Sequence, residues 1–444
     1  MALRPAGSTL TLPKGVWSLD ANAKRQVPEG DQAVAKLLGN FAPSHNFRRD
    51  LLAYCTLRNL IPHPKLLPLH PDEEERQGAA SSETSTNGNI YDLNDVENIS
   101  VKHWQIDDGN YRALCFTLPF ATKIRSVCLF NVGLNKEQVA VLCSTIPKTH
   151  VAVLQLEWNP IAVAATKEAG ENHVTNATPS MGSPSRPSSA SQSASRSPPV
   201  ETATNNSKQQ HELRMQQDLQ SGGENDVSEM FAQLINEESA LVFLSLRANG
   251  ISSRGATALA RALRTNKTLE ALNLFQNSIG DAGARAFAYA LPFNTTLKTL
   301  SLANNQLTGH GVKLLVDGLT KYVAPPELLS EFEAAETVIH TQIEQAKKAK
   351  KKLDRATIIA QLGLPVLEIV DGVQFAPGNS TLEELLLSGN TDLDASDLAT
   401  VSETLEKFKS KLKTHLRCIK LQRLPKSRAH TIKDPQHLSE FIKL

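Results

Sequence analysis

The residue types that most often catalyse reactions or bind metal ions are scattered through this 444-residue sequence. The twelve histidines are dispersed, and the five cysteines show neither CxxC nor Cys/His metal spacing (Cys55, Cys115, Cys128, Cys143, Cys418). There is no GxxxxGK[ST], HExxH or GxSxG motif, and no GxGxxG follows a predicted strand. The stretch SGGEND at residues 221–226 has glycines and carboxylates, but its polar surroundings favour a flexible spacer. We therefore expect no enzyme, and no cofactor, metal or small-molecule site.

Binding through charge is better supported near the C-terminal end. Ten Lys or Arg and no Asp or Glu lie between Lys407 and Lys433, whereas the whole chain carries a net charge of only +1. This stretch is therefore a basic pole on a chain that has no overall bias towards nucleic acid. Such lysines usually form a solvated face, yet the missing carboxylates favour an acidic partner. The candidate residues are Lys407, Lys409, Lys411, Lys413, Arg417, Lys420 and Arg423.

An internal repeat must position any binding residues. The segments that begin at residues 241, 269 and 297 align as LxxLxLxxNxI/L followed by a helical half, so the period is 28 residues. This is the signature of a leucine-rich repeat, in which each unit is one strand and one helix. Fainter copies begin near residues 124, 151, 382 and 416, which makes about seven strands. We predict an α/β solenoid, a horseshoe with a parallel concave sheet and convex helices.

The repeat also predicts which side chains face outward from the concave sheet. Its variable positions hold four aromatic residues, in a chain that is only 5% aromatic (Phe130, Trp158, Phe243, Phe275). Clustered aromatic side chains are typical anchors of protein interfaces. Two alternatives remain open, because these rings could instead stack on each other or be covered by another segment of the chain.

Two interruptions and two ends complete the organisation. The first interruption is rich in Ser and Pro and too poor in large apolar residues to fold, whereas the second predicts one long charged helix. An apolar stripe along the helix of the second interruption could lie on its own protein or on a partner (Leu328, Phe332, Ala335, Ile339, Ile343). The expected segments are 1–90, an N-terminal helical segment and polar linker; 91–163, a cap and first repeats; 164–226, a disordered insertion; 227–323, regular repeats; 324–365, the inserted helix; 366–423, C-terminal repeats; and 424–444, a basic tail.

The expected cellular compartment depends on two kinds of apolar segment that are not found in the sequence. The first residues have no apolar signal segment, and no later segment reaches the roughly 20 apolar residues of a membrane span. We expect a cytoplasmic protein that has reduced cysteines and no membrane partner. The sequons at Asn266, Asn294 and Asn379 match the glycosylation pattern, but on this view they are coincidental.

The repeats are similar to the ribonuclease-inhibitor class. The order LSLANNQLTGHGVKLLVDGL, a lysine-rich insertion and DGVQFAPGNSTLEELLLSGN resembles the leucine-rich repeat-containing protein 71 family, as does VCLFNVGL at residues 127–134. The insertion is shorter here than in that family. The resemblance implies a non-enzymatic scaffold of the motile cilium or flagellum, a cytoskeletal axoneme protein that binds other axonemal proteins, tubulin or another acidic surface. The alternative is a regulator that resembles the Ran GTPase-activating proteins, although that family typically ends in an acidic tract.

Overall fold

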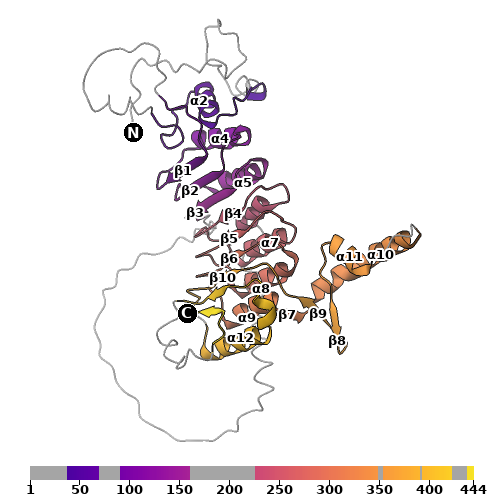
Figure 1. The fold of residues 1–444 in the computed structure, drawn as a ribbon. Coiled ribbons are helices and arrows are strands. Elements are labelled where there is room, and N and C mark those ends of the chain that lie inside the picture. Colours follow the sequence, from indigo (N-terminus) through magenta and orange to yellow (C-terminus); the bar gives the residue numbers. More distant parts are fainter. Residues whose placement is uncertain (1–37, 70–90, 161–225, 349–353, 391–392, 423–437) are drawn as a thin grey trace, which may run out of the picture.

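Parallel strands run through the whole molecule as one sheet. The computed structural model describes residues 38–69, 91–160, 226–348, 354–390, 393–422 and 438–444. The main sheet has nine strands in the order β1-β2-β3-β4-β5-β6-β10-β11-β12, every pair parallel. The helices lie along one side of this sheet (Figure 1). The predicted leucine-rich repeat solenoid is confirmed, with nine strands in place of about seven.

The strands are short, and most of the helices that pack on them resemble one another in length. The strands of the main sheet are β1 Asn98–Lys102, β2 Ser126–Phe130, β3 Val153–Glu157, β4 Phe243–Ser245, β5 Ala271–Asn273, β6 Thr299–Ser301, β10 Glu384–Leu386, β11 Cys418–Lys420 and β12 Ile442–Lys443. The helices are α2 Phe47–Leu57, α4 Asp108–Thr117, α5 Lys136–Thr145, the 3-10 helix η3 Val227–Ile235, α7 Ser253–Leu263, α8 Gly280–Ala290, α9 Gly309–Leu319, α12 Ala395–Lys407 and α13 Lys409–Leu412. Short 3-10 turns extend three of them, at η1 Leu118–Phe120, η2 Ile146–Lys148 and η4 Leu291–Phe293.

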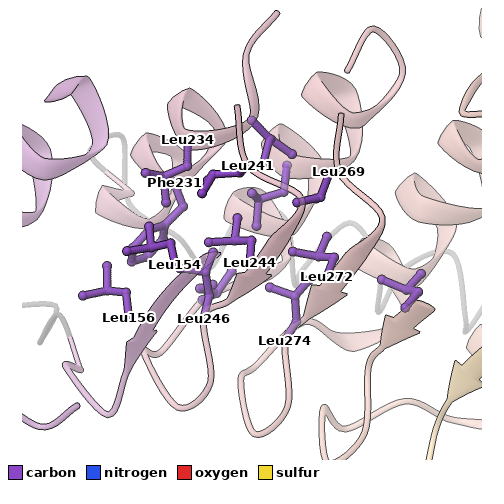
Figure 2. Close-up of a cluster of buried hydrophobic side chains, with 14 of the residues drawn as sticks. Leu154, Leu156, Phe231, Leu234, Leu241, Leu244, Leu246, Leu269, Leu272 and Leu274 are labelled. Carbon is purple, nitrogen blue, oxygen red and sulfur yellow. The ribbon is translucent and has the colours of Figure 1, made fainter. Parts of the chain in front are cut away.

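The repeated leucines form the core. Leu244, Leu272 and Leu300 occupy the same register position on neighbouring strands, and each is at most 1% exposed. Figure 2 shows Leu272 and its neighbours stacked between the strands and the helices. A single repeat cannot bury these side chains, so each coil depends on the next one for its stability.

A buried ladder of asparagines closes the turn after each strand. Asn277 Nδ2 donates to the Leu246 carbonyl of the preceding coil at 3.0 Å, and its Oδ1 accepts from the amides of Asn249 and Ile251. Asn159, Asn249, Asn305 and Asn390 make equivalent bonds. The ladder satisfies backbone groups that the turns would otherwise leave buried and unpaired.

Three of the sequon asparagines, Asn266, Asn294 and Asn379, form a second ladder at the turn before the strand. Asn294 Nδ2 donates to the Leu263 carbonyl at 2.8 Å, and its Oδ1 accepts from the amides of Thr296 and Leu297. Asn266 and Asn379 repeat this arrangement, and all three side chains are about 1% exposed. The N-x-T-L sequence is therefore part of the repeat, and a glycan at these three asparagines has no room in the folded chain.

The second interruption is an arm and not the single helix predicted at 324–365. Residues 321–377 form two helices, α10 Pro326–Lys348 and α11 Arg355–Gln361, and an antiparallel sheet in the order β7-β9-β8. Its strands are β7 Lys321–Val323, β8 Glu368–Val370 and β9 Val373–Pro377. Residues 366–377 thus belong to the arm and not to the C-terminal repeats. The arm projects from the helical side of the solenoid (Figure 1).

The arm has a small core of its own. Ile339 on α10 is fully buried against Ile358 and Ile359 of α11, while Leu328 packs with Phe293 and Ala376 near the base. The predicted apolar stripe therefore docks on its own protein. This is the first of the two alternatives given for it above. Asp354 accepts from the Thr357 amide and begins α11, which divides the predicted helix into two.

The two ends of the sheet differ from the prediction in one respect. At the N-terminal end, α2 lies on α4 with Phe47 and Leu51 fully buried, as a cap requires. At the other end the predicted basic tail at 424–444 supplies the last strand, β12, and Phe441 is 4% exposed. Residues 164–225 of the predicted insertion lie outside the described residues.

Candidate interaction surfaces

The concave face carries the four predicted aromatic residues, but they do not form one patch. Phe130 lies between His103 and Trp158, with ring centroids 4.8 Å and 6.4 Å away. Trp158 is 39% exposed and has a positive φ of 56°, the conformation that recurs before each ladder asparagine. These three rings therefore form one aromatic cluster at the rim of the sheet.

Phe243 and Phe275 lie apart from this cluster. Phe243 is aligned with Val153 and Ala271, at the opposite end of the strands from Phe130. Phe275 is covered by the guanidinium of Arg247, which lies 4.9 Å from the ring centroid. Both rings are half-buried.

A charged pair separates Phe130 from Phe275. Arg247 Nη1 lies 3.5 Å from Glu157 Oε2, and Ser245 Oγ donates to Glu157 Oε1 at 2.6 Å. Sequence reasoning missed this pair, because 88 residues separate Ser245 from Glu157 in the chain. The concave face therefore offers an aromatic cluster beside a polar site, which is a mixed surface typical of specific binding.

The basic pole is partly neutralised in three dimensions, because four of its ten cations have carboxylate partners within the described residues. Lys409 pairs with Glu406 at 2.9 Å, Lys413 with Glu440 at 3.0 Å and Arg417 with Glu383 at 2.9 Å. These carboxylates come from α12, the terminal segment and the adjacent repeat. The local sequence therefore overstated the free positive charge.

The four remaining predicted basic residues differ from one another. Lys420 lies 3.9 Å from Glu384, and Lys407 lies over the Phe408 ring at 5.7 Å. Burial, together with the charge of Lys321, lowers the pKa of Lys411. Arg423 lies outside the described residues.

The described residues hold no cluster of three His, Cys, Asp or Glu side chains able to bind a metal ion. All five cysteines are free and buried. Burial, with a smaller effect of Asp107, raises the pKa of Cys55 to about 12, and burial raises that of Cys115 to about 11. These two thiols are therefore protonated at neutral pH and unreactive as nucleophiles.

A cavity of about 850 Å³ lies between the convex helices and the base of the arm. Its lining includes Arg264, Tyr289, Tyr322 and Glu331. Arg264 lies 4.8 Å from the Tyr289 ring centroid and 4.0 Å from that of Phe293, and it donates two hydrogen bonds to Glu331. This contact joins the solenoid to the arm, so the cavity lies beside a structural junction.

Comparison with protein families finds a match at residues 265–288 and 293–316 to the family described as Leucine Rich repeat. No curated protein matches the chain. The matched segments contain two of the three regular repeats, and the sheet continues the same geometry on both sides of them. The chain therefore contains leucine-rich repeats within a solenoid fold, and such repeats generally serve protein interaction. Within the described residues no helix is long and apolar enough to cross a membrane.

Proposed function

We propose that the protein is a non-enzymatic scaffold of the motile cilium or flagellum, which binds partner proteins through the concave face. The observation that carries the scaffold function is the aromatic cluster of Trp158, Phe130 and His103 on an uninterrupted sheet. Exposed tryptophan beside charged neighbours is typical of interface anchors. A repeat sheet also holds such side chains on a rigid support, which lowers the entropy lost on binding.

The ciliary location rests on the resemblance of residues 300–319, the following insertion and residues 371–390 to the leucine-rich repeat-containing protein 71 family. The partners would then be other axonemal proteins. A tagged copy expressed in ciliated cells should concentrate in cilia. A tagged copy found wholly outside cilia would contradict the location and leave the scaffold function standing.

Tubulin tails and other acidic surfaces are the weaker choice of partner. They would have to displace Glu440 from Lys413 and Glu383 from Arg417 before meeting those cations. Exchange of one ion pair for another in water yields little net free energy. The concave aromatic cluster needs no such displacement.

Sedimentation with purified axonemes tests the proposal. Trp158→Ala should reduce the bound fraction several-fold with little change in its salt dependence, as expected for an apolar anchor. Val141→Ala is the matched control, because Val141 is similarly exposed but lies on a convex helix. Equal binding by the wild type and the Trp158 variant would exclude the concave cluster as the interface.

A further inference from the structure

The arm is the part of the described chain where large apolar side chains reach solvent most densely. Of thirteen exposed large apolar residues, seven lie between residues 321 and 377, and four of these lie between 366 and 373 (Val323, Val338, Leu362, Val366, Ile369, Val370, Val373). Ile369 alone is 67% exposed. Single exposed apolar side chains are ordinary, but a cluster on a projecting element marks an interaction surface.

Strand β8 is an open edge of the arm sheet. Among the described residues it pairs with β9 alone, and Val370 is aligned with Val373 across the turn Asp371–Gly372. The Gln374 carbonyl accepts from the Ala324 amide on the β7 side, so it points away from β8. Ile369 and Gln374 are therefore a non-hydrogen-bonded pair, and the Ile369 amide and carbonyl point towards the open edge.

This edge is short and carries Glu368, but it has no lysine, proline or bulge to oppose strand pairing. Natural edge strands are blunted by lysine, proline or a bulge, but β8 reads Glu-Ile-Val. Between Arg355 and Lys407 the sequence contains no Lys or Arg. An extended segment is the one structure that can satisfy a strand edge along its length.

A groove of about 710 Å³ adjoins the edge. It lies between α10, α11 and the β8–β9 hairpin, and its apolar lining includes Phe332, Ile359, Val366 and Ile369. A side chain directly opposite Ile369 on an added strand would lie on the same face as Ile369. That side chain would enter the groove, so backbone pairing and side-chain burial would act together.

The charges near the groove indicate which charge the bound segment should carry. Glu336 is paired with Arg355 at 2.7 Å, but within the described residues no ion pair forms to Glu333 or Asp371. Glu368 is paired with Lys321 at 2.5 Å, so self-pairing of two β8 strands would bring two uncompensated copies of Asp371 into one short ribbon. Because that arrangement concentrates like charge, a second copy is a poorer occupant than a basic segment.

We propose that the arm binds an extended segment of a partner protein, which pairs with β8, places an apolar side chain in the groove and carries Lys or Arg beside Glu333 and Asp371. This inference rests on the proposed scaffold function and adds a second interface, remote from the concave face. The partner segment is therefore an extended strand that combines basic residues with β-branched or other apolar residues.

The test is selection of short peptides from a displayed random library on the full-length chain, followed by affinity measurement with synthetic copies. Enriched peptides should combine apolar or β-branched residues with Lys or Arg. Ile369→Pro removes the outward amide at an edge position that tolerates proline, and it should weaken binding at least about tenfold. Glu333→Lys should weaken it and reduce its salt dependence. Ile369→Val keeps the amide and should bind like the wild type.

The outcomes separate this inference from the proposed function. Trp158→Ala should leave peptide affinity unchanged while reducing axoneme binding, because the two surfaces are distinct. Peptides that bind Ile369→Pro as tightly as the wild type, or a library that yields none, would overturn the arm inference alone. A wild-type dimer that Ile369→Pro dissociates would overturn it in favour of a second copy. Unchanged melting temperatures of the variants establish that the fold is retained.

Discussion

Arg264, just after α7, donates two hydrogen bonds to the Glu331 carboxylate on α10 and thereby joins the repeat layer to the arm. The guanidinium lies over the Tyr289 and Phe293 rings, whose centroids are 5.5 Å apart, so two side chains of the solenoid help to orient it. A planar, bidentate contact fixes direction as well as distance. The orientation of the projecting arm therefore depends strongly on one arginine.

Loss of this contact should loosen the arm without unfolding the solenoid. In Arg264→Ala, amide exchange in α10, α11 and β9 should speed up, while exchange in α8 and α9 stays near wild type. Arg285→Ala is the control, because Arg285 and Glu327 are both about half exposed and 3.8 Å apart. Equal exchange in the two variants would show that the Arg264 contact does not hold the arm.

The same contact predicts a pH dependence. Burial alone would raise the pKa of Glu331, but the hydrogen bonds and charge of Arg264 outweigh it, so the pKa lies below its usual range. A lowered folded-state pKa stabilises docking at neutral pH, and the contribution is lost as pH falls through that value. The protection of arm amides in the wild type, measured relative to the intrinsic exchange rate at each pH, should therefore fall on acidification. Glu331→Gln should show less protection than the wild type at neutral pH and respond less to acid.

The asparagine ladder should contribute more to stability than its side-chain size suggests. Asn277→Ala leaves the Leu246 carbonyl and two amides of the preceding coil buried without this partner. Each such group costs about 1 to 3 kcal/mol, so the free energy of unfolding should fall by several kcal/mol. Urea unfolding measures the change. Gln276→Ala, next to it but partly exposed, should alter stability by less than about 0.5 kcal/mol.

The ladder and the core could be predicted because they repeat. Leu272 and Asn277 recur every 28 residues, and a period of that length specifies which side chains stack. The signal for the β8–β9 hairpin was also present, since Asp371–Gly372 between apolar residues is a strong turn sequence. The assignment of residues 366–423 to the C-terminal repeats overlooked it.

Contacts between distant segments carried no such signal. Glu157 meets Arg247 across the first interruption, and Lys413 meets Glu440 across the residues before β12. Both pairs form only when the strands stack in register. A local count of charge therefore identified the cations and could not identify the carboxylates that neutralise them.

Close approach of neighbouring helices predicts a second stability effect. A Cβ on Gly311 would lie 2.2 Å from Asp281 Oδ1, which already accepts from the Thr308 amide at 2.9 Å. Gly311→Ala must therefore push α9 from α8 or break that bond, and it should cost about 1 to 3 kcal/mol. Gly39→Ala has open space around it and should be neutral in the same thermal unfolding assay. Equal melting temperatures would show that the helices can separate freely.

The last prediction concerns the basic pole. Lys409 and Lys413 both contact Glu440, and Ser439 Oγ donates to Glu406, so these groups fasten the terminal segment to α12 and α13. Replacing both lysines with glutamate would gather four carboxylates at this junction. We expect β12 to detach more often, because four like charges would replace the ion pairs and oppose the burial of Phe441 and the Ser439–Ser402 hydrogen bond, which also hold the segment.

Hydrogen exchange detects this detachment directly. The amides of Ile419 and Leu421 donate to carbonyls of Phe441 and Lys443, so their protection reports on β12. Both should lose protection in the double variant and recover part of it at high salt, where repulsion is screened. Lys407→Glu changes the same charge on α12 outside this junction and should leave both amides protected. Protection of both amides in the double variant would show that Phe441 burial and the Ser439–Ser402 hydrogen bond hold the strand without the ion pairs, and reduced binding by that variant could then be assigned to surface charge.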